Sequence, residues 1–179
     1  MRCHCVQMHE HGDDAGPERD RPALTETAAR LLRAVATGDR AAFGELFDRF
    51  GGLFTASIAT VQADAATRDR LCIEAFASVW RRAREGARSP EPVLWLLEVL
   101  CETLGSASAT ARRPLADGLL ALACPDRELL LLAVAGRYSQ SEIAALTGVR
   151  ESRLRAVLRD ALGSLRGGLG GLGEGRLTA

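Results

Sequence analysis

Residues 138–166 read YSQSEIAALTGVRESRLRAVLRDALGSLR, two short amphipathic segments joined at a Thr-Gly turn. Ser139 is followed three residues later by Glu142, the pattern of a capping box in which each side chain satisfies an amide donor at the start of a helix. Gly148 can adopt the left-handed backbone that ends a helix. This stretch therefore predicts a helix-turn-helix.

The second segment carries apolar residues at three- and four-residue spacing, which predicts a helix buried along one stripe. These residues are Leu154, Val157, Leu158, Ala161, Leu162 and Leu165. At about 100° per residue, Arg155, Arg159 and Arg166 line one flank of the stripe. A cationic edge suits a DNA phosphate backbone, but charge on an exposed face is also typical of any solvated helix. The residues alone leave both interpretations open.

Composition narrows the class of protein. The chain has 179 residues and is 47% hydrophobic, enough to form packed cores and to exclude a disordered protein. Its 23 basic and 23 acidic residues balance, so attraction to nucleic acid must come from local charge. No apolar run approaches the roughly 20 residues that a membrane span needs. We expect a cytoplasmic protein that does not enter a membrane.

Cysteine and histidine usage does not predict a metal site. Cys72, Cys101 and Cys124 are isolated within apolar segments and are expected to be reduced core residues. Residues 1–23 are polar and without periodicity, so we expect a disordered tail. The tail contains Cys3, His4, Cys5, His9 and His11. Zinc needs four ligands held in a tetrahedron, and nothing in the sequence orders this segment, so we predict neither a metal nor a cofactor.

Residues 24–104 show a helical pattern throughout and are expected to form the first domain. Thr25 is expected to cap a first helix that ends at Gly38, and Asp39 to cap the next. Gly51 and Gly52 are expected to interrupt that second helix before a further helix at 53–61. Residues 65–83 predict a long amphipathic helix, and residues 93–104 a strongly apolar one whose only charges are those of Glu98 and Glu102.

Residues 105–114 have the small residues and proline of a linker. Beyond it, residues 115–166 are expected to form a second domain, with two helices broken by Pro125, Asp126 as a helix cap, and then the helix-turn-helix. Residues 167–179 are rich in glycine and are expected to be flexible. The predicted fold is all-α, with two small helical domains joined by a flexible linker.

The order of these segments resembles the extracytoplasmic-function (ECF) group of the sigma-70 family of RNA polymerase sigma factors. The segments that carry the resemblance are GDRAAFGELFDRF (38–50), DRLCIEAFASVW (69–80), PVLWLLEVL (92–100) and DRELLLLAVAGRYSQSEIAALTGV (126–149). The resemblance implies a promoter-melting domain and a helix-turn-helix domain that reads the upstream promoter element. Response-regulator output domains share the helix-turn-helix but not the first domain.

Two sets of site residues follow from this resemblance. The helix at 69–80 matches the one that grips the clamp helices of RNA polymerase, which implies Asp69, Leu71, Glu74, Phe76 and Trp80 as polymerase-binding residues. The last segment implies that Arg150, Ser152, Arg153, Arg155 and Arg159 lie on or near DNA.

The chain departs from the family pattern at several positions. Ile73 stands where the family usually has glutamine, and Arg70 where it has an acidic residue. Glu98, Glu102 and Thr103 stand where arginine and asparagine usually meet promoter DNA. Reversing charge against a polyanion replaces attraction with repulsion, which argues against a strongly melting first domain. Arg112 and Arg113 are candidates for compensating contacts from the linker.

The first hypothesis is a sigma-like transcription initiation factor that binds RNA polymerase core and directs it to promoter DNA. An anti-sigma factor is a candidate partner. One alternative is a degenerate sigma paralogue that acts as a protein-interaction module without opening promoters. Another is a helix-turn-helix regulator that binds DNA as a dimer. An enzyme is not expected, because the sequence has no Gly-rich phosphate loop and no nucleophile–base arrangement.

Overall fold

A computed structural model of the chain describes residues 21–107, 112–113 and 116–173. Over these residues the chain is helical and contains no strand, which confirms the predicted all-α class. The helices are α1 (Arg21–Ala36), α2 (Arg40–Val61), α3 (Ala65–Gly86), α4 (Pro92–Ser106), α5 (Ala116–Ala121), α6 (Asp126–Val134), α7 (Gln140–Thr147) and α8 (Glu151–Gly173).

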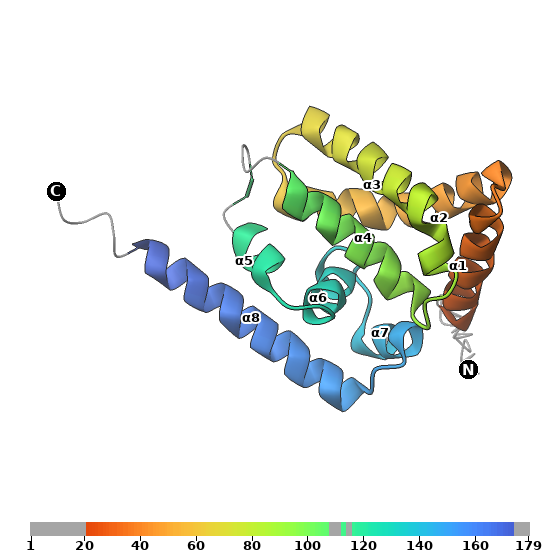
Figure 1. Cartoon of the computed structure of the whole chain (residues 1–179). Helices are drawn as coiled ribbons and strands as arrows, with labels where there is room; N and C mark the ends of the chain where they lie inside the picture. Colours follow the sequence, from red (N-terminus) through yellow and green to blue (C-terminus); the bar gives the residue numbers. More distant parts are fainter. Residues whose placement is uncertain (1–20, 108–111, 114–115, 174–179) are drawn as a thin grey trace, which may run out of the picture.

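The first three helices pack on one another, and α4 lies across them (Figure 1). Gly38 separates α1 from α2 with a φ of 91°, and the Asp39 carboxylate then accepts hydrogen bonds from the amides of Ala41 and Ala42. Both features were predicted. Thr25 was wrongly predicted to be the cap of α1, because α1 begins at Arg21. The Thr25 hydroxyl instead donates to the carbonyl of Leu146, at 3.1 Å.

Helix α2 runs without a break through Gly51 and Gly52, so the expected interruption there was wrong. Phe50 and Phe54, on either side of the two glycines, are both buried in the core. They can point the same way only if the helix continues between them, since residues four apart share a face. Burial of these rings outweighs the low helix propensity of glycine, roughly 1 kcal/mol per residue.

Helix α4 is the central helix of the molecule. It contacts α1, α2 and α3 on one side and α5, α6 and α7 on the other. Its Trp95 ring packs against the backbone of Gly86, where an added Cβ would lie 2.5 Å from ring carbons. Such close packing requires glycine at the end of α3.

The linker arginines are held by backbone carbonyls of the first half. The Arg112 guanidinium donates to the carbonyls of Leu104 and Ala107, at 3.0 and 2.7 Å, at the end of α4. The Arg113 amide donates to the carbonyl of Val61 at 2.7 Å, and its Nε to that of Ala59 at 2.8 Å. Some of the donors of both arginines are therefore engaged within the chain, and compensating DNA contacts from these residues stay a prediction.

The helix-turn-helix forms as predicted. Ser139 and Glu142 make a full capping box at the start of α7, and Gly148 ends it with a φ of 69°. Two details differ from expectation. Asp126 is the first residue of α6 and not its cap, a position that Pro125 takes. Helix α8 continues to Gly173, past the expected end at Arg166, so residues 167–173 are helical.

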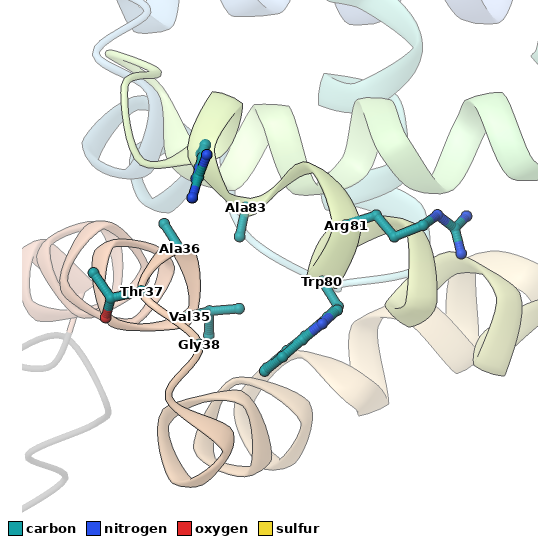
Figure 2. A pocket seen from close by; sticks show the side chains of 8 residues that line it. Val35, Ala36, Thr37, Gly38, Trp80, Arg81 and Ala83 are labelled. Carbon is teal, nitrogen blue, oxygen red and sulfur yellow. The ribbon is translucent and has the colours of Figure 1, made fainter.

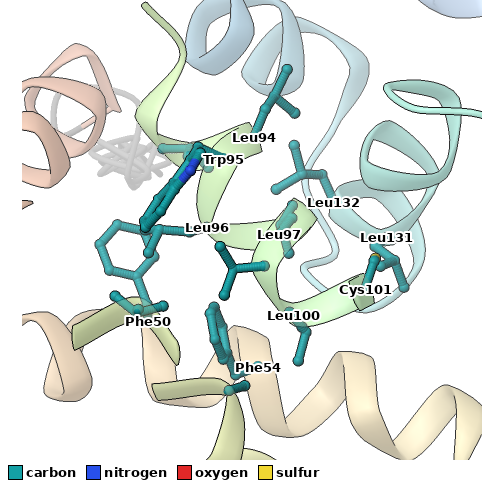
Figure 3. Packing of buried hydrophobic residues seen from close by; sticks show 14 of the residues in the cluster. Phe50, Phe54, Leu94, Trp95, Leu96, Leu97, Leu100, Cys101, Leu131 and Leu132 are labelled. Carbon is teal, nitrogen blue, oxygen red and sulfur yellow. The ribbon is translucent and has the colours of Figure 1, made fainter. Parts of the chain in front are cut away.

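The two halves of the chain share one continuous hydrophobic core. In Figure 3, Leu131 and Leu132 of α6 face Leu97 and Cys101 of α4. The domain boundary within 105–114 remains a prediction, but the helices on either side of it are packed together. This arrangement fixes the orientation of the helix-turn-helix relative to the first half.

Candidate functional site

An open apolar groove lies between α2 and α3. Its volume is about 410 Å³, and its lining residues are Phe43, Phe47, Ile73, Phe76, Ala77, Trp80 and Arg81. The rings inside it are ordered by edge-to-face packing, with the Phe43 and Trp80 centroids 5.1 Å apart. Phe47 is 46% exposed and Ile73 69% exposed. Large apolar side chains this open to water, beside a preformed hollow, favour a protein-binding surface.

The residues predicted to bind polymerase fall into three groups. Leu71 and Phe76 are buried, so they build the core, although Phe76 also forms the groove floor. Asp69 and Glu74 are exposed but do not line the groove, and Glu74 pairs with Arg70 at 3.8 Å. Trp80 is half-buried and forms a groove wall.

Sequence reasoning missed Phe47 and Ile73 as surface residues. Phe47 was not singled out within the segment 38–50, and Ile73 was noted only as a departure from the family pattern. A signal for Ile73 was present, since it lies off the stripe formed by Leu71, Ala75 and Val79. An apolar residue outside the buried face of an amphipathic helix indicates a contact with something other than the core.

The accessible edge of α4 is acidic. Glu102 is exposed and pairs with Arg82 of α3, which also binds Glu85 at 2.9 Å. The Arg82 guanidinium lies over the Trp95 ring, 5.9 Å from its centroid. Burial alone would lower the pKa of Arg82, but the hydrogen bonds to Glu85 and Glu102 outweigh it and raise the pKa. Glu102 therefore ties α4 to α3, in a position where the resemblance places DNA contacts.

The residues predicted to bind DNA are all exposed and lie at the start of α8 or just before it. They are Arg150, Ser152, Arg153, Arg155 and Arg159. Ser152, Arg155 and Arg159 share one face, because they are three and four residues apart. Arg153 lies on the opposite flank of the buried stripe formed by Leu154 and its neighbours. The set is thus divided, and Arg155 is partly engaged by Glu151 at 3.6 Å.

Within the described part of the chain, no three His, Cys, Asp or Glu side chains could together hold a metal ion. Cys3, His4, Cys5, His9 and His11 lie outside the described residues. Cys72, Cys101 and Cys124 are free thiols, and burial raises the pKa of Cys101 to about 12. Cys101 is buried as expected, but Cys124 is exposed, so its prediction as a core residue was wrong. None of the helices in the described ranges is both long enough and apolar enough to span a bilayer.

Comparison with known proteins agrees with this architecture. No family model matches the chain. The ECF RNA polymerase sigma factor SigK is 26% identical in Mycobacterium tuberculosis and Mycobacterium bovis, over 177 residues that cover 81% of this chain and 95% of SigK. SigK of Mycobacterium ulcerans is 27% identical over the same shares.

Among solved structures, CnrH in complex with the cytosolic domain of CnrY shares the fold. The TM-score is 0.51 at 22% identity, over 81% of this chain and 98% of that one. The chain is thus similar in sequence to ECF sigma factors over most of its length, and it shares the fold of CnrH; these similarities support a divergent member of the ECF group of the sigma-70 family.

Proposed function

We propose that the chain acts in transcription initiation by binding RNA polymerase core through the α2–α3 groove and directing it to promoter DNA through α8. The observation that carries the proposal is the open apolar groove beside Ile73, on the helix that matches the polymerase-gripping helix of the family. Similarity to SigK, named an RNA polymerase sigma factor, supports the same role.

The groove favours a protein partner for a physical reason. Phe47 and Ile73 remain exposed in the free chain, and covering them would release apolar surface from water. Burial of a large side chain contributes about 1.5–3 kcal/mol, so these two residues alone offer a substantial part of a binding free energy. The aromatic packing that fixes Trp80 and Phe43 keeps the groove formed before a partner arrives, which lowers the entropic cost of binding.

On the DNA side, α8 is proposed to carry most of the affinity. Its exposed arginines can neutralise phosphates and release counterions. The accessible edge of α4 offers Glu98 and Glu102, which repel phosphates, and the rest of α4 is largely buried. The proposed DNA-binding residues therefore remain Arg150, Ser152, Arg153, Arg155 and Arg159, with Arg155 and Arg159 as the phosphate contacts on a shared face.

A second protein partner is proposed from the solved relative. CnrH was solved with the cytosolic domain of CnrY, so a regulatory partner of this kind is a candidate for the present chain. We expect the chain to act in the cytoplasm, where RNA polymerase meets DNA, and to perform no catalysis itself.

The test is co-purification with RNA polymerase core, followed by run-off transcription on genomic fragments. We expect the unmodified chain to retain core and Ile73→Asp to lose it, because a carboxylate would be placed in the apolar groove. Val134→Asp is the matched control, since Val134 is 56% exposed but lies on α6, outside the groove. Failure of the unmodified chain to retain core would overturn the proposal.

A further inference from the structure

A small hollow between the two halves of the chain differs in chemistry from the larger one at the end of α1. The larger hollow, of about 490 Å³, is partly polar, since Arg81 and Arg84 border it. Figure 2 shows Trp80 reaching from α3 toward the turn at Gly38 in that place. The smaller hollow, of about 210 Å³, lies where α2 of the first half meets α5, α6 and α8 of the second. It is called the seam hollow below.

The seam hollow is lined almost entirely by branched apolar side chains. Six of its seven lining residues are leucine or valine, and the seventh is Thr60 of α2. Leu130 and Leu131 of α6 are buried and form its inner wall. Val134 is 56% exposed and Leu162 of α8 is 47% exposed, so these two border its opening. The hollow is thus apolar inside and open to solvent at one end.

The lining selects the chemistry of an occupant. It contains no charged side chain, so an ion entering it would lose its hydration without gaining a partner. The Thr60 hydroxyl donates to the carbonyl of Ser57 at 2.7 Å, and its oxygen keeps the capacity to accept one further hydrogen bond. A neutral, largely apolar molecule with at most one donor group meets these conditions.

The size of the hollow argues for a small molecule and against a protein. A helix is about 10–12 Å across and does not fit a hollow of this volume. A protein docked over it would need about 800 Å² of interface on each partner. Among the side chains that the structure describes, the large apolar residues exposed in this region are Val134 and Leu162, and both border the hollow itself. The apolar surface therefore ends where the hollow ends.

We propose that the seam hollow binds one small neutral molecule, an aromatic ring system or a hydrocarbon of similar size. An apolar cavity of about 150 Å³ binds benzene, so this hollow suits a molecule of roughly six to nine carbon atoms. The bound molecule contacts Thr60 of the first half and leucines of the second, and so stabilises the packing of the two halves. This site is separate from the α2–α3 groove and from α8 residues proposed to bind DNA.

The experiment measures binding of indole to the full chain, without polymerase or DNA. Indole has the size of the hollow, and its N–H group can donate to the Thr60 oxygen. We expect saturation-transfer NMR to detect binding and Tm to rise with indole concentration, because a ligand that binds the folded chain stabilises it. Benzoate is of similar size but charged, so it should neither bind nor raise Tm.

Val134→Trp tests the location of the bound indole. The variant places the same ring, tethered to α6, at the opening of the hollow, where it should compete and lower the affinity for indole by about tenfold or more. Ile73→Trp is the matched control, because it adds the same ring at another exposed β-branched residue, beside the α2–α3 groove. It should leave the affinity unchanged. Circular dichroism checks that both variants are folded.

Three results would overturn the inference. One is the absence of indole binding to the unmodified chain, and another is a loss of affinity in Ile73→Trp but not in Val134→Trp. The third is a dimer in sedimentation that Val134→Trp dissociates, since a second copy of the chain would then fill the hollow. Polymerase takes no part in these measurements, so the proposed function stands or fails independently of them.

Discussion

At the scale of single residues, Gly86 decides how closely α3 and α4 approach. A Cβ at this position would lie 2.5 Å from the Trp95 ring, so Gly86→Ala must displace either the ring or the backbone. We expect the free energy of unfolding to fall by about 1–3 kcal/mol, the usual cost of overpacking. Denaturant unfolding measures the change.

Gly52→Ala is the matched control for that substitution. Gly52 lies within α2, is exposed, and has no atom within 4 Å of an added Cβ. The free energy of unfolding should rise, by up to about 1 kcal/mol, because alanine favours a helix more than glycine does. A loss of stability at Gly52 would mean that α2 is not continuous there.

Asp64 is expected to give α3 a pH-dependent cap. Its side-chain and backbone hydrogen bonds with Thr67 hold the pKa of the Asp64 carboxyl below its ordinary value of 3.8. A folded-state pKa below the unfolded one means that the ionised carboxylate stabilises the fold above about pH 4, and that this contribution disappears as pH falls through the lowered pKa. Asp64→Asn should therefore lower Tm at neutral pH, with the difference vanishing in acid. An equal difference at both pH values would contradict this.

At the scale of helices, local signals were predicted well from the sequence because they involve few neighbouring residues. The capping box of Ser139 and Glu142, the left-handed Gly148 and the Asp39 cap each depend on contacts within one turn. Thr25 has the same capping chemistry, yet its hydroxyl bonds Leu146, far along the chain. No local pattern could have indicated that use.

The surface residues were predicted less well, because the way a helix packs decides which of its residues face the core and which face water. Leu71 fits the family pattern but is buried, whereas Ile73 departs from that pattern and is the side chain left open. A resemblance aligns positions without showing which of them the neighbouring helices cover. The packing of α2 against α3 determines which positions are covered. These contacts join residues that are far apart in the sequence, so they could not be predicted from a local pattern.

The exposed arginines of α8 are predicted to bind DNA phosphates. Arg159→Ala should weaken binding to DNA of any sequence. If Arg159 neutralises one phosphate, the slope of the logarithm of the binding constant against the logarithm of the salt concentration should fall in magnitude by about one. Arg49→Ala on α2 is the control, since Arg49 is also exposed but lies far from the helix-turn-helix in sequence and pairs with Glu45. Titration of labelled DNA at several salt concentrations measures both. An unchanged slope for Arg159→Ala would remove this residue from the DNA contact.

At the scale of the whole molecule, α4 joins the two halves. The sequence of this helix is apolar on nearly every side, which predicted burial but not what covers it. The first half covers one side, and α6 and α7 cover the other. The linker arginines add to this by bonding carbonyls at the ends of α2 and α4. The two predicted domains are thus packed against each other in this structure.

A shared core implies that the two halves unfold together. Leu132 lies in the second half, is fully buried, and faces α4 of the first half (Figure 3). Leu132→Ala should lower the free energy of unfolding by about 2–5 kcal/mol, as expected for a large-to-small change in a core. Because α4 loses packing as well, calorimetry should show one transition shifted as a whole, and amide exchange should speed up in α3 and α4 as well as in α6. Two separate transitions, with only the second half affected, would mean that the halves are independent domains and that the contact across α4 contributes little to stability.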